Sequence, residues 1–149
     1  MLEHLTTRPS QTAAVARRFA GALSSLPLHI HLRGELGAGK TLWARALIKA
    51  LGGTNAPSPS FPMAISHTPA AMTVHHLDLF RLPQGSLLPE DLLELTQEDA
   101  LCLVEWPERA ADLPSADILL SFEFMTDGRR LSFDAKSARG GECLSAFLR

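Results

Sequence analysis

The fold is decided by one stretch of sequence, Leu28 to Leu51, which reads LHIHLRGELGAGKTLWARALIKAL. Its first six residues, Leu28 to Arg33, alternate in polarity and predict a short strand. A glycine-rich turn follows at once, and the residues from Leu42 to Leu51 then predict a helix that ends at Gly52-Gly53. The order strand, glycine-rich turn, helix is the start of a βαβ unit and indicates an α/β protein.

The turn itself, Gly34 to Thr41, has the sequence GELGAGKT of a P-loop. Its glycines let backbone N–H groups close around phosphates at the start of the helix. In this pattern the lysine, Lys40, reaches the β- and γ-phosphate oxygens, and the hydroxyl of Thr41 ligates Mg²⁺. The sequence therefore predicts that the chain binds a nucleoside triphosphate.

The composition fits a single globular domain spanning residues 1–149, with 46% hydrophobic and 20% charged residues. No apolar run approaches the ~20 residues of a membrane span, and the start of the chain lacks the pattern of a signal peptide, so we expect a cytoplasmic protein. Cys102 and Cys143 are far apart and predict reduced, packed thiols. The formal net charge of −2 argues against strong autonomous binding of nucleic acid, but not against contact within a larger complex.

The remaining patterns extend this α/β reading. Pro9-Ser10 predicts the cap of a helix that runs to Ala20. Further helices are expected from 89 to about 97 and over 143–148, and further strands over 63–66, 73–80, 101–106, 118–124 and 131–135. Asp127-Gly128 predicts a hairpin between the last two strands, and three prolines predict a stiff loop over 55–62. We therefore expect a P-loop NTPase-like three-layer sandwich, with a mixed sheet and a C-terminal antiparallel hairpin.

A hydrolytic P-loop protein also needs an acid near the metal at the end of a neighbouring strand. Glu105 and Asp78 are the two candidates, and Glu105 is favoured because the strand before it is more fully apolar. Glu105 could instead be a surface carboxylate at a strand end, and Asp78 could form a salt bridge to Arg81. Both alternatives stay open at this point.

Three other features allow more than one interpretation. His75 and His76 could suggest a metal site, but they are adjacent on a strand and point to opposite faces, which favours structural or hydrogen-bonding roles. Trp106 could belong to the core or line the nucleotide pocket. Ser58-Pro59-Ser60 could be a phosphate-sensing switch segment, or its serines could serve turn chemistry alone.

Four motifs in a fixed order resemble the TsaE (YjeE) family, the P-loop ATPase of bacterial tRNA threonylcarbamoyladenosine biosynthesis. They are the P-loop, Ser58-Pro59-Ser60-Phe61, the segment from His76 to Leu82, and Val104-Glu105-Trp106-Pro107-Glu108. The resemblance covers essentially the whole chain. It implies a Mg²⁺-dependent ATPase that docks on a complex of the TsaB and TsaD subunits and hydrolyses ATP to support their turnover. Contact with tRNA would be indirect, through that complex.

The resemblance also assigns roles to residues. Lys40 would hold the phosphates, Thr41 with Glu105 would hold Mg²⁺, and Asp78 with Ser60 would belong to the hydrolytic or switch shell. The other positions expected near the nucleotide are Ser10, Gly37, Ala38, Gly39, Leu42, Trp106 and Arg129.

Three positions depart from the family pattern. Ser60 stands where the family usually has Thr, and Phe80 where it usually has Tyr. The segment from Leu92 to Leu101 is short and lacks a glycine often found there, so the resemblance assigns no partner contacts to that region.

The expected catalysis is positioning and charge stabilisation. We expect weak activity for the isolated chain, since no obvious arginine finger lies beside the site and Arg81 and Arg109 are only formal candidates. Two alternative functions remain at the level of sequence: a small-molecule P-loop kinase, and a non-hydrolytic scaffold whose ATP binding assembles a complex.

Overall fold

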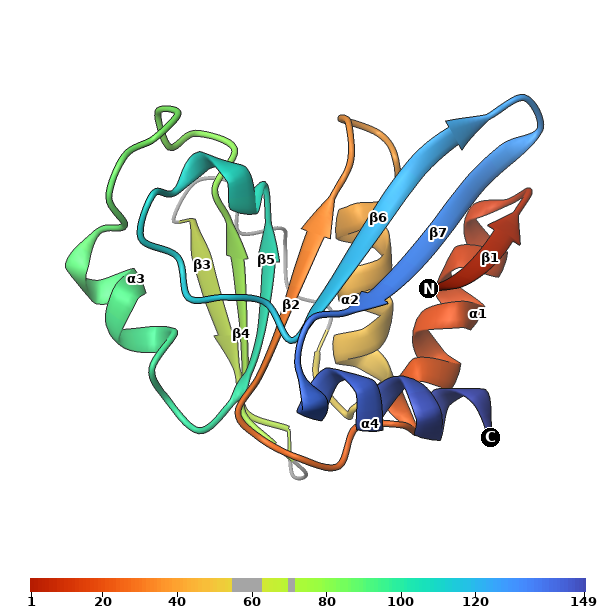
Figure 1. The fold of residues 1–149 in the computed structure, drawn as a ribbon, viewed down its shortest axis with the longest axis horizontal. Coiled ribbons are helices and arrows are strands. Elements are labelled where there is room, and N and C mark those ends of the chain that lie inside the picture. The colour runs from red at the N-terminus through yellow and green to blue at the C-terminus, as the bar shows by residue number, and fades with distance from the viewer. Residues whose placement is uncertain (55–62, 70–71) are drawn as a thin grey trace.

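A seven-stranded mixed sheet organises the chain, as the computed structural model of residues 1–54, 63–69 and 72–149 shows (Figure 1). In spatial order its strands are β1 (Leu2–Thr6), β7 (Gly128–Ala135), β6 (Ile118–Met125), β2 (Leu28–Arg33), β5 (Leu101–Glu105), β4 (Val74–Asp78) and β3 (Ala64–His67). The central strands β6, β2, β5 and β4 run parallel, whereas β1, β7 and β3 are antiparallel to their neighbours. The sheet is therefore mixed, with β6 and β7 forming the expected hairpin.

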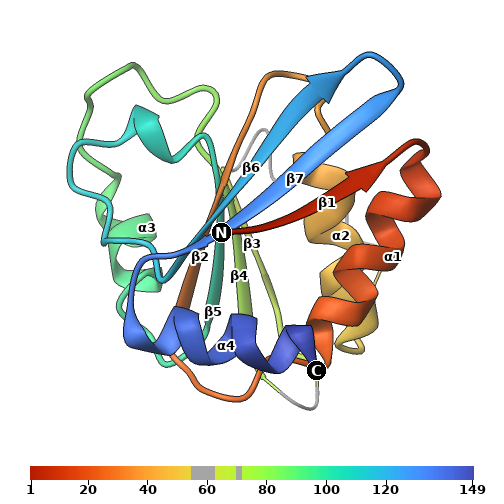
Figure 2. The same cartoon turned by 45° about the vertical axis from the view of Figure 1, so that its right-hand side comes forward.

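Helices cover both faces of this sheet (Figures 1 and 2). The helical elements are α1 (Pro9–Ala20), α2 (Lys40–Ala50), α3 (Glu90–Leu95), the 3₁₀ turn η1 (Pro107–Arg109) and α4 (Ala138–Leu148). Figure 2 shows α1 and α2 together on one side of the sheet, and α3 with η1 on the other. The three-layer α/β architecture predicted from the sequence is thus confirmed. No helix within 1–54, 63–69 and 72–149 is long and apolar enough to cross a membrane.

The core has two parts because successive strand residues face opposite sides of the sheet. On β5, Leu101 and Leu103 pack in the larger part with α1, α2 and α4, while Cys102 and Val104 pack in the smaller part with α3. Aromatic rings fill the larger part: the ring of Phe19 lies 5.4 Å from that of Trp43 and 5.3 Å from that of Phe147. Both cysteines are buried free thiols, and burial raises the pKa of Cys102 to about 12.

At the two ends of the chain, three details differ from the sequence expectations. Strand β1 was not predicted: its alternation is broken by Leu5, which is 72% exposed. The first helix is not capped by Ser10, because Arg8 occupies the N-cap position and Pro9 begins the helix. The last helix begins five residues earlier than expected, at Ala138, where the Ser137 hydroxyl caps it by accepting from the Gly140 N–H at 3.0 Å.

Gly128 fixes the junction between the hairpin and β1. A Cβ atom built at Gly128 would lie 2.0 Å from the carbonyl oxygen of Thr6, which no side chain tolerates. The two strands pair so that Thr6 lies opposite Arg129. The glycine therefore lets the end of β1 lie against the start of β7, beside the glycine-rich turn.

Candidate functional site

The two carboxylates singled out in the sequence end neighbouring parallel strands at the same edge of the sheet. Asp78 and Glu105 lie opposite each other in the pairing of β4 with β5. Both candidate acids therefore stand at a strand end beside the glycine-rich turn. Helix α2 begins at this edge, and the carboxyl ends of parallel strands are where α/β proteins bind ligands. A cavity of about 420 Å³ opens there, lined by Leu36, Gly37, Ala38, Gly39, Lys40, Thr41, Leu42, Asp78, Phe80, Glu105 and Trp106.

Glu105 is held by a hydrogen bond on each carboxylate oxygen. The Thr41 hydroxyl donates to Oε1 at 2.7 Å, and Nε2 of His76 lies 2.7 Å from Oε2. The side chains of Glu105 and His76 are each only 2% exposed. Glu105 is therefore a buried carboxylate joined to the first turn of α2, and the surface-carboxylate interpretation is wrong.

The ammonium group of Lys40 is held beneath the glycine-rich turn. It donates to the carbonyl oxygen of Gly34 and, at 3.0 Å, to that of Glu35. It also lies 4.2 Å from the centre of the Trp106 ring, within range of a cation–π contact. Burial lowers the pKa of Lys40, and the charge of Glu105 opposes that shift. Lys40 is thus a desolvated cation with contacts that an anion could replace.

Asp78 lies beside this cation and is 7% exposed. Burial raises its pKa, while the Phe80 N–H, which donates to Oδ1 at 3.0 Å, opposes the shift. Among the ion pairs of the described residues none joins Asp78 to Arg81, so the salt-bridge interpretation is not supported. The carboxylate faces the cavity instead.

Trp106 forms one wall of the site from an uncommon backbone conformation. Its φ of 59° and ψ of 49° lie in the left-handed region, which is rare for an aromatic residue and tends to mark functional positions. Its ring lies 5.0 Å from that of Phe80, and the Arg109 guanidinium lies 5.5 Å from the Trp106 ring centre. This conformation places the indole over Lys40, so Trp106 lines the pocket.

A second cavity, of about 220 Å³, lies on the other side of the glycine-rich turn. It is lined by Thr6, Thr7, Arg8, Pro9, Thr12, Gly37, Ala38, Gly39, Leu42, Gly128 and Arg129. Arg129 links its wall to the turn, since one guanidinium nitrogen donates to the Gly37 carbonyl oxygen at 3.4 Å. The two cavities share Gly37, Ala38, Gly39 and Leu42, so a ligand with two chemically different parts could reach both.

Comparison with known proteins agrees with this geometry. Residues 6–131 match the family model described as threonylcarbamoyl adenosine biosynthesis protein TsaE. The chain belongs to the TsaE family. It is 32% identical over 142 residues to tRNA threonylcarbamoyladenosine biosynthesis protein TsaE of Haemophilus influenzae, with 88% of this chain and 87% of that protein covered. It is 34% identical to the protein of the same name from Rickettsia bellii, with 81% and 85% covered.

A solved structure shows that the similarity extends to the whole fold. The crystal structure of YdiB from Bacillus subtilis superposes with a TM-score of 0.83 at 25% sequence identity, covering 99% of this chain and 94% of that one. The seven strands and their helices therefore form an arrangement already seen in an experimental structure.

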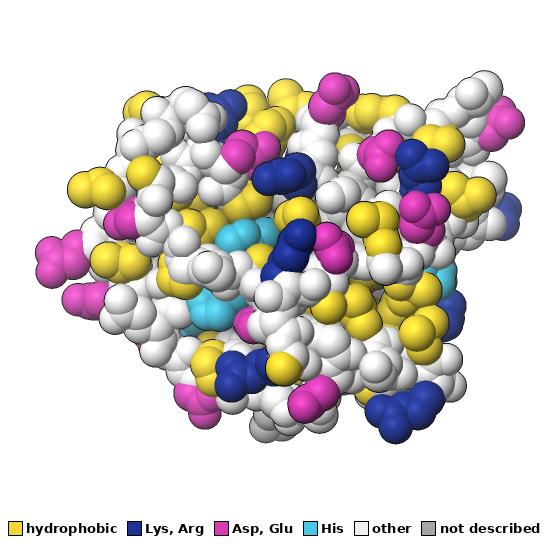
Figure 3. All heavy atoms as spheres, in the orientation of Figure 1, with side chains coloured by type: hydrophobic (Ala, Val, Ile, Leu, Met, Phe, Trp, Pro, Cys, Tyr) yellow, Lys and Arg dark blue, Asp and Glu magenta, His cyan; other side chains and the backbone are white. Residues whose placement is uncertain are grey.

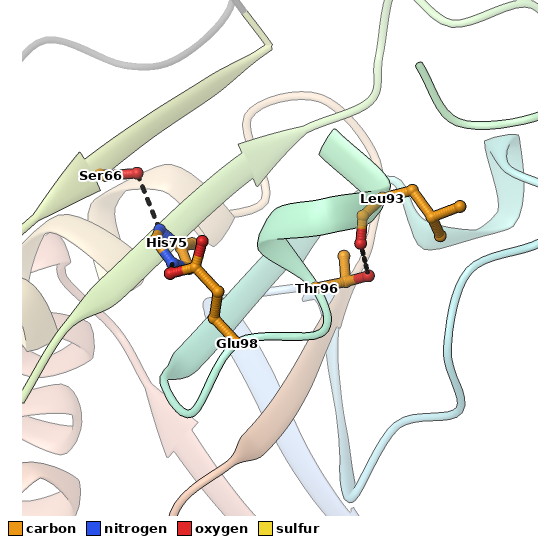
Figure 4. A network of polar contacts seen from close by, with 5 residues as sticks. All are labelled: Ser66, His75, Leu93, Thr96 and Glu98. Atoms are coloured by element: carbon orange, nitrogen blue, oxygen red, sulfur yellow. Dashed lines mark hydrogen bonds and ion pairs between the residues drawn. The ribbon is translucent and has the colours of Figure 1, made fainter. Parts of the chain in front are cut away.

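In this TsaE-family chain the two adjacent histidines serve different faces of the sheet, as their strand position predicted. His76 contacts Glu105, whereas His75 lies between Ser66, whose hydroxyl is 2.7 Å from Nδ1, and Glu98, whose Oε1 is 2.9 Å from Nε2 (Figure 4). Figure 4 also shows the Thr96 hydroxyl donating to the Leu93 carbonyl oxygen, which closes the turn after α3. The His75 network holds the edge strand β3 in place. Within the described residues, no cluster of three or more His, Cys, Asp or Glu could hold a metal ion.

The structure brings together most of the residues to which the TsaE-family resemblance assigned roles. All of the expected residues line one or both cavities, except Ser10 and Ser60. Ser10 is exposed in the first turn of α1, one residue beyond Pro9 of the second cavity. Ser60, with the rest of the 55–62 segment, lies outside the described residues.

Sequence reasoning missed several residues around the two cavities. A structural or hydrogen-bonding role was expected for His76, but Glu105 was not identified as its partner. Thr6 was missed because strand β1 was missed, and Arg8 and Thr12, at the start of α1, carried no signal of their own. The Thr6 and Thr12 hydroxyl oxygens lie 3.0 Å apart and join β1 to α1. No regular alternation marked this strand, because Glu3 and His4 are both polar and Leu5 is exposed.

Proposed function

We propose that this chain is a Mg²⁺-dependent ATPase of tRNA N6-threonylcarbamoyladenosine modification. It would dock on the TsaB–TsaD complex and hydrolyse ATP for the turnover of that complex, in the cytoplasm, with tRNA contacted indirectly. The observation that carries the proposal is the 2.7 Å hydrogen bond between the Thr41 hydroxyl and Glu105, directly below the glycine-rich turn. A hydroxyl at a helix start and a buried strand-end carboxylate meet there as a P-loop hydrolase requires.

The residues fit the expected groups. Thr41 and Glu105 supply hard oxygen donors, which suit Mg²⁺, with room in the cavity for the waters that this ion keeps. Gly37 and Gly39 have φ values of 78° and 111°, so the turn adopts conformations that L side chains disfavour and that aim backbone N–H groups at an anion. Mg²⁺ bound at Thr41 and Glu105 would neutralise charge on the β- and γ-phosphates.

Lys40, Asp78 and Trp106 would then act on the reacting end of the nucleotide. Lys40 would exchange its bonds to the Gly34 and Glu35 carbonyls for phosphate oxygens. The Asp78 carboxylate, buried and opposite Glu105, would accept a hydrogen bond from the attacking water and so orient it. Trp106 would exclude bulk water, which strengthens each charge interaction in the site.

The second cavity would receive the nucleoside. Arg129 reaches the glycine-rich turn from this side, and Ser10 lies in the first turn of α1, one residue beyond Pro9 of this cavity. The shared loop residues would place the phosphates in the larger cavity and the ribose and base in the smaller one.

The positions of Arg81 and Arg109, the two arginine-finger candidates, support the proposal of low intrinsic activity. The Arg109 guanidinium stacks near Trp106 and Phe80 and donates to the Leu82 carbonyl oxygen at 3.4 Å, so it is held as a wall of the site. Arg81 is exposed. A partner that orders the site or adds a positive charge would raise the rate.

Reconstitution is the direct test. We expect threonylcarbamoyl transfer to tRNA by the TsaB–TsaD complex to continue over many turnovers with this chain and ATP, and to stop early without them. Equal product yield with and without the chain would refute the pathway role while leaving nucleotide binding intact.

Hydrolysis and binding can be separated with Glu105→Gln. The amide keeps the size of the side chain and loses the charge that holds Mg²⁺, so ATP turnover should fall by about 10² or more, the usual range for loss of one charge-stabilising group, while ATP still binds. If this variant without measurable turnover supported multiple rounds of modification, the chain would be a nucleotide-dependent scaffold. Phosphorylated product in a screen of nucleosides and metabolites would instead indicate a kinase.

A further inference from the structure

Helices α1 and α2 carry charge of one sign only. Neither helix contains an Asp or Glu; their charged residues are Arg17, Arg18, Lys40, Arg45 and Lys49. The whole chain nevertheless has 16 acidic residues against 14 Lys and Arg. Acidic side chains gather on the other side of the sheet, around α3, where Figure 3 shows them at the left edge of the molecule. The protein therefore has one basic helical face.

This basic face is hollowed by a groove of about 870 Å³ between α1 and α2. Arg17, Arg45 and Lys49 line it and are exposed. None of the three pairs with a carboxylate in the described parts of the chain, and the segments outside them, 55–62 and 70–71, contain no Asp or Glu. Three neighbouring cations without a counter-charge create a positive potential that attracts an anionic partner.

The floor of the groove favours a protein partner over a nucleic acid. Ala13, Ala46 and Ala50 line the groove beside the cations, together with Leu42, which is 38% exposed. Small apolar side chains allow a helix to approach closely, as in helix-in-groove recognition. A phosphate backbone would gain nothing from this apolar floor, and the net charge of −2 opposes its binding outside the groove.

We propose that the α1–α2 groove binds an acidic helical segment of a partner protein. Its carboxylates pair with Arg17, Arg45 and Lys49, and its small apolar side chains cover the alanines. The identity of the partner rests on the proposed function, in which the TsaB–TsaD complex docks on this chain. Thr41 and Leu42 line both this groove and the nucleotide cavity, so the bound segment contacts the helix turn that holds the phosphates.

The test measures the affinity of the purified TsaB–TsaD complex for charge-reversal variants. Arg17→Glu with Arg45→Glu changes the groove; Lys136→Glu with Arg149→Glu makes the same change of charge at exposed positions outside it. We expect the groove variant to bind at least about tenfold more weakly and with a smaller salt dependence, and the control to bind within about twofold of the wild type. Unchanged ATP affinity and melting temperature would show that the groove variant is folded.

Three results would overturn the proposal. If the wild type binds the complex and both double variants bind equally well, the groove is not the docking surface, and the proposed function stands. If the wild type does not bind the complex at all, the proposed partner is wrong and the groove proposal falls with it. If the groove variant keeps its affinity for the complex but loses binding to free tRNA or to a second copy of the chain, the surface serves that other partner.

Discussion

Replacing His76 with leucine should destabilise the nucleotide-free protein by about 2–3 kcal/mol. The histidine Nε2 lies 2.7 Å from Oε2 of Glu105, and both side chains are 2% exposed, so solvent cannot replace the lost donor. A hydrogen bond to a charged group contributes about 1.5–3 kcal/mol, and a buried charge deprived of its partner costs more than an exposed one. Leucine fills a similar volume, so a cavity adds little. For a domain of this size the melting temperature should fall by about 5–10 °C.

Urea unfolding of metal-free protein measures this difference, with His76→Gln as the matched variant because its amide keeps an N–H donor. We expect the glutamine variant to recover a substantial part of the lost stability. A double-mutant cycle with Glu105→Gln isolates the pair, and the coupling should be at least about 1 kcal/mol. A loss below about 0.5 kcal/mol for His76→Leu, or additivity in the cycle, would show that the two residues are near each other without being energetically joined.

Substitutions at Asp78, Gly128 and Trp106 give three further predictions. Burial raises the pKa of Asp78, so the folded state binds the Asp78 proton more tightly than the unfolded state does. Ionised Asp78 therefore opposes folding at neutral pH. This destabilisation disappears as the pH falls through the raised pKa. Asp78→Asn should therefore stabilise the nucleotide-free protein at pH 7 by on the order of 1 kcal/mol, less at pH 5, and abolish ATP turnover; lower stability at pH 7 in urea unfolding would contradict this. Gly128→Ala should cost about 1–3 kcal/mol, since its Cβ meets the Thr6 carbonyl, whereas Gly141→Ala, with nothing within 4 Å, should be neutral or stabilising. Trp106→Asn suits the left-handed backbone and should keep the melting temperature within a few degrees while weakening ATP binding about tenfold by calorimetry; Trp106→Val, β-branched at φ 59°, should lose stability as well.

Much of the fold could be predicted because its signals are local. The strand, glycine-rich turn and helix from Leu28 to Leu51 follow each other in sequence, and the hairpin is marked by Asp127-Gly128. The pairing of Asp78 with Glu105 could not be read in the same way, because it depends on which strands become neighbours. Strand β1 was not predicted for another reason. Leu5 is an exposed apolar residue, so the alternation of polar and apolar residues that indicates a strand is broken.

Helix ends and pair contacts were the least predictable parts of the site. Ser10 has the chemistry of a cap, but Pro9 fits the first helical position, so the helix begins before the serine. The last helix begins at Ala138, so Gly140 and Gly141 lie inside it. Gly140 is required there because a Cβ atom would lie 2.0 Å from the Asp117 carbonyl oxygen. Such close contacts between segments far apart in the chain depend on the tertiary structure and cannot be predicted from local sequence patterns.

The hydrogen bonds around Glu105 divide the site into a fixed part and an exchangeable part. Thr41 uses Oε1 and His76 uses Oε2, so the first turn of α2 can give up its bond to Glu105 while His76 still holds the carboxylate in place. Lys40 is bonded to carbonyl oxygens of the turn itself, which an incoming phosphate can replace. Thr41 and Leu42 also line the basic groove, so a partner bound there could shift the start of α2. Such a shift would change the Thr41–Glu105 hydrogen bond and leave the His76–Glu105 hydrogen bond in place. A stimulated rate would then require movement of one helix only, with Glu105 already positioned.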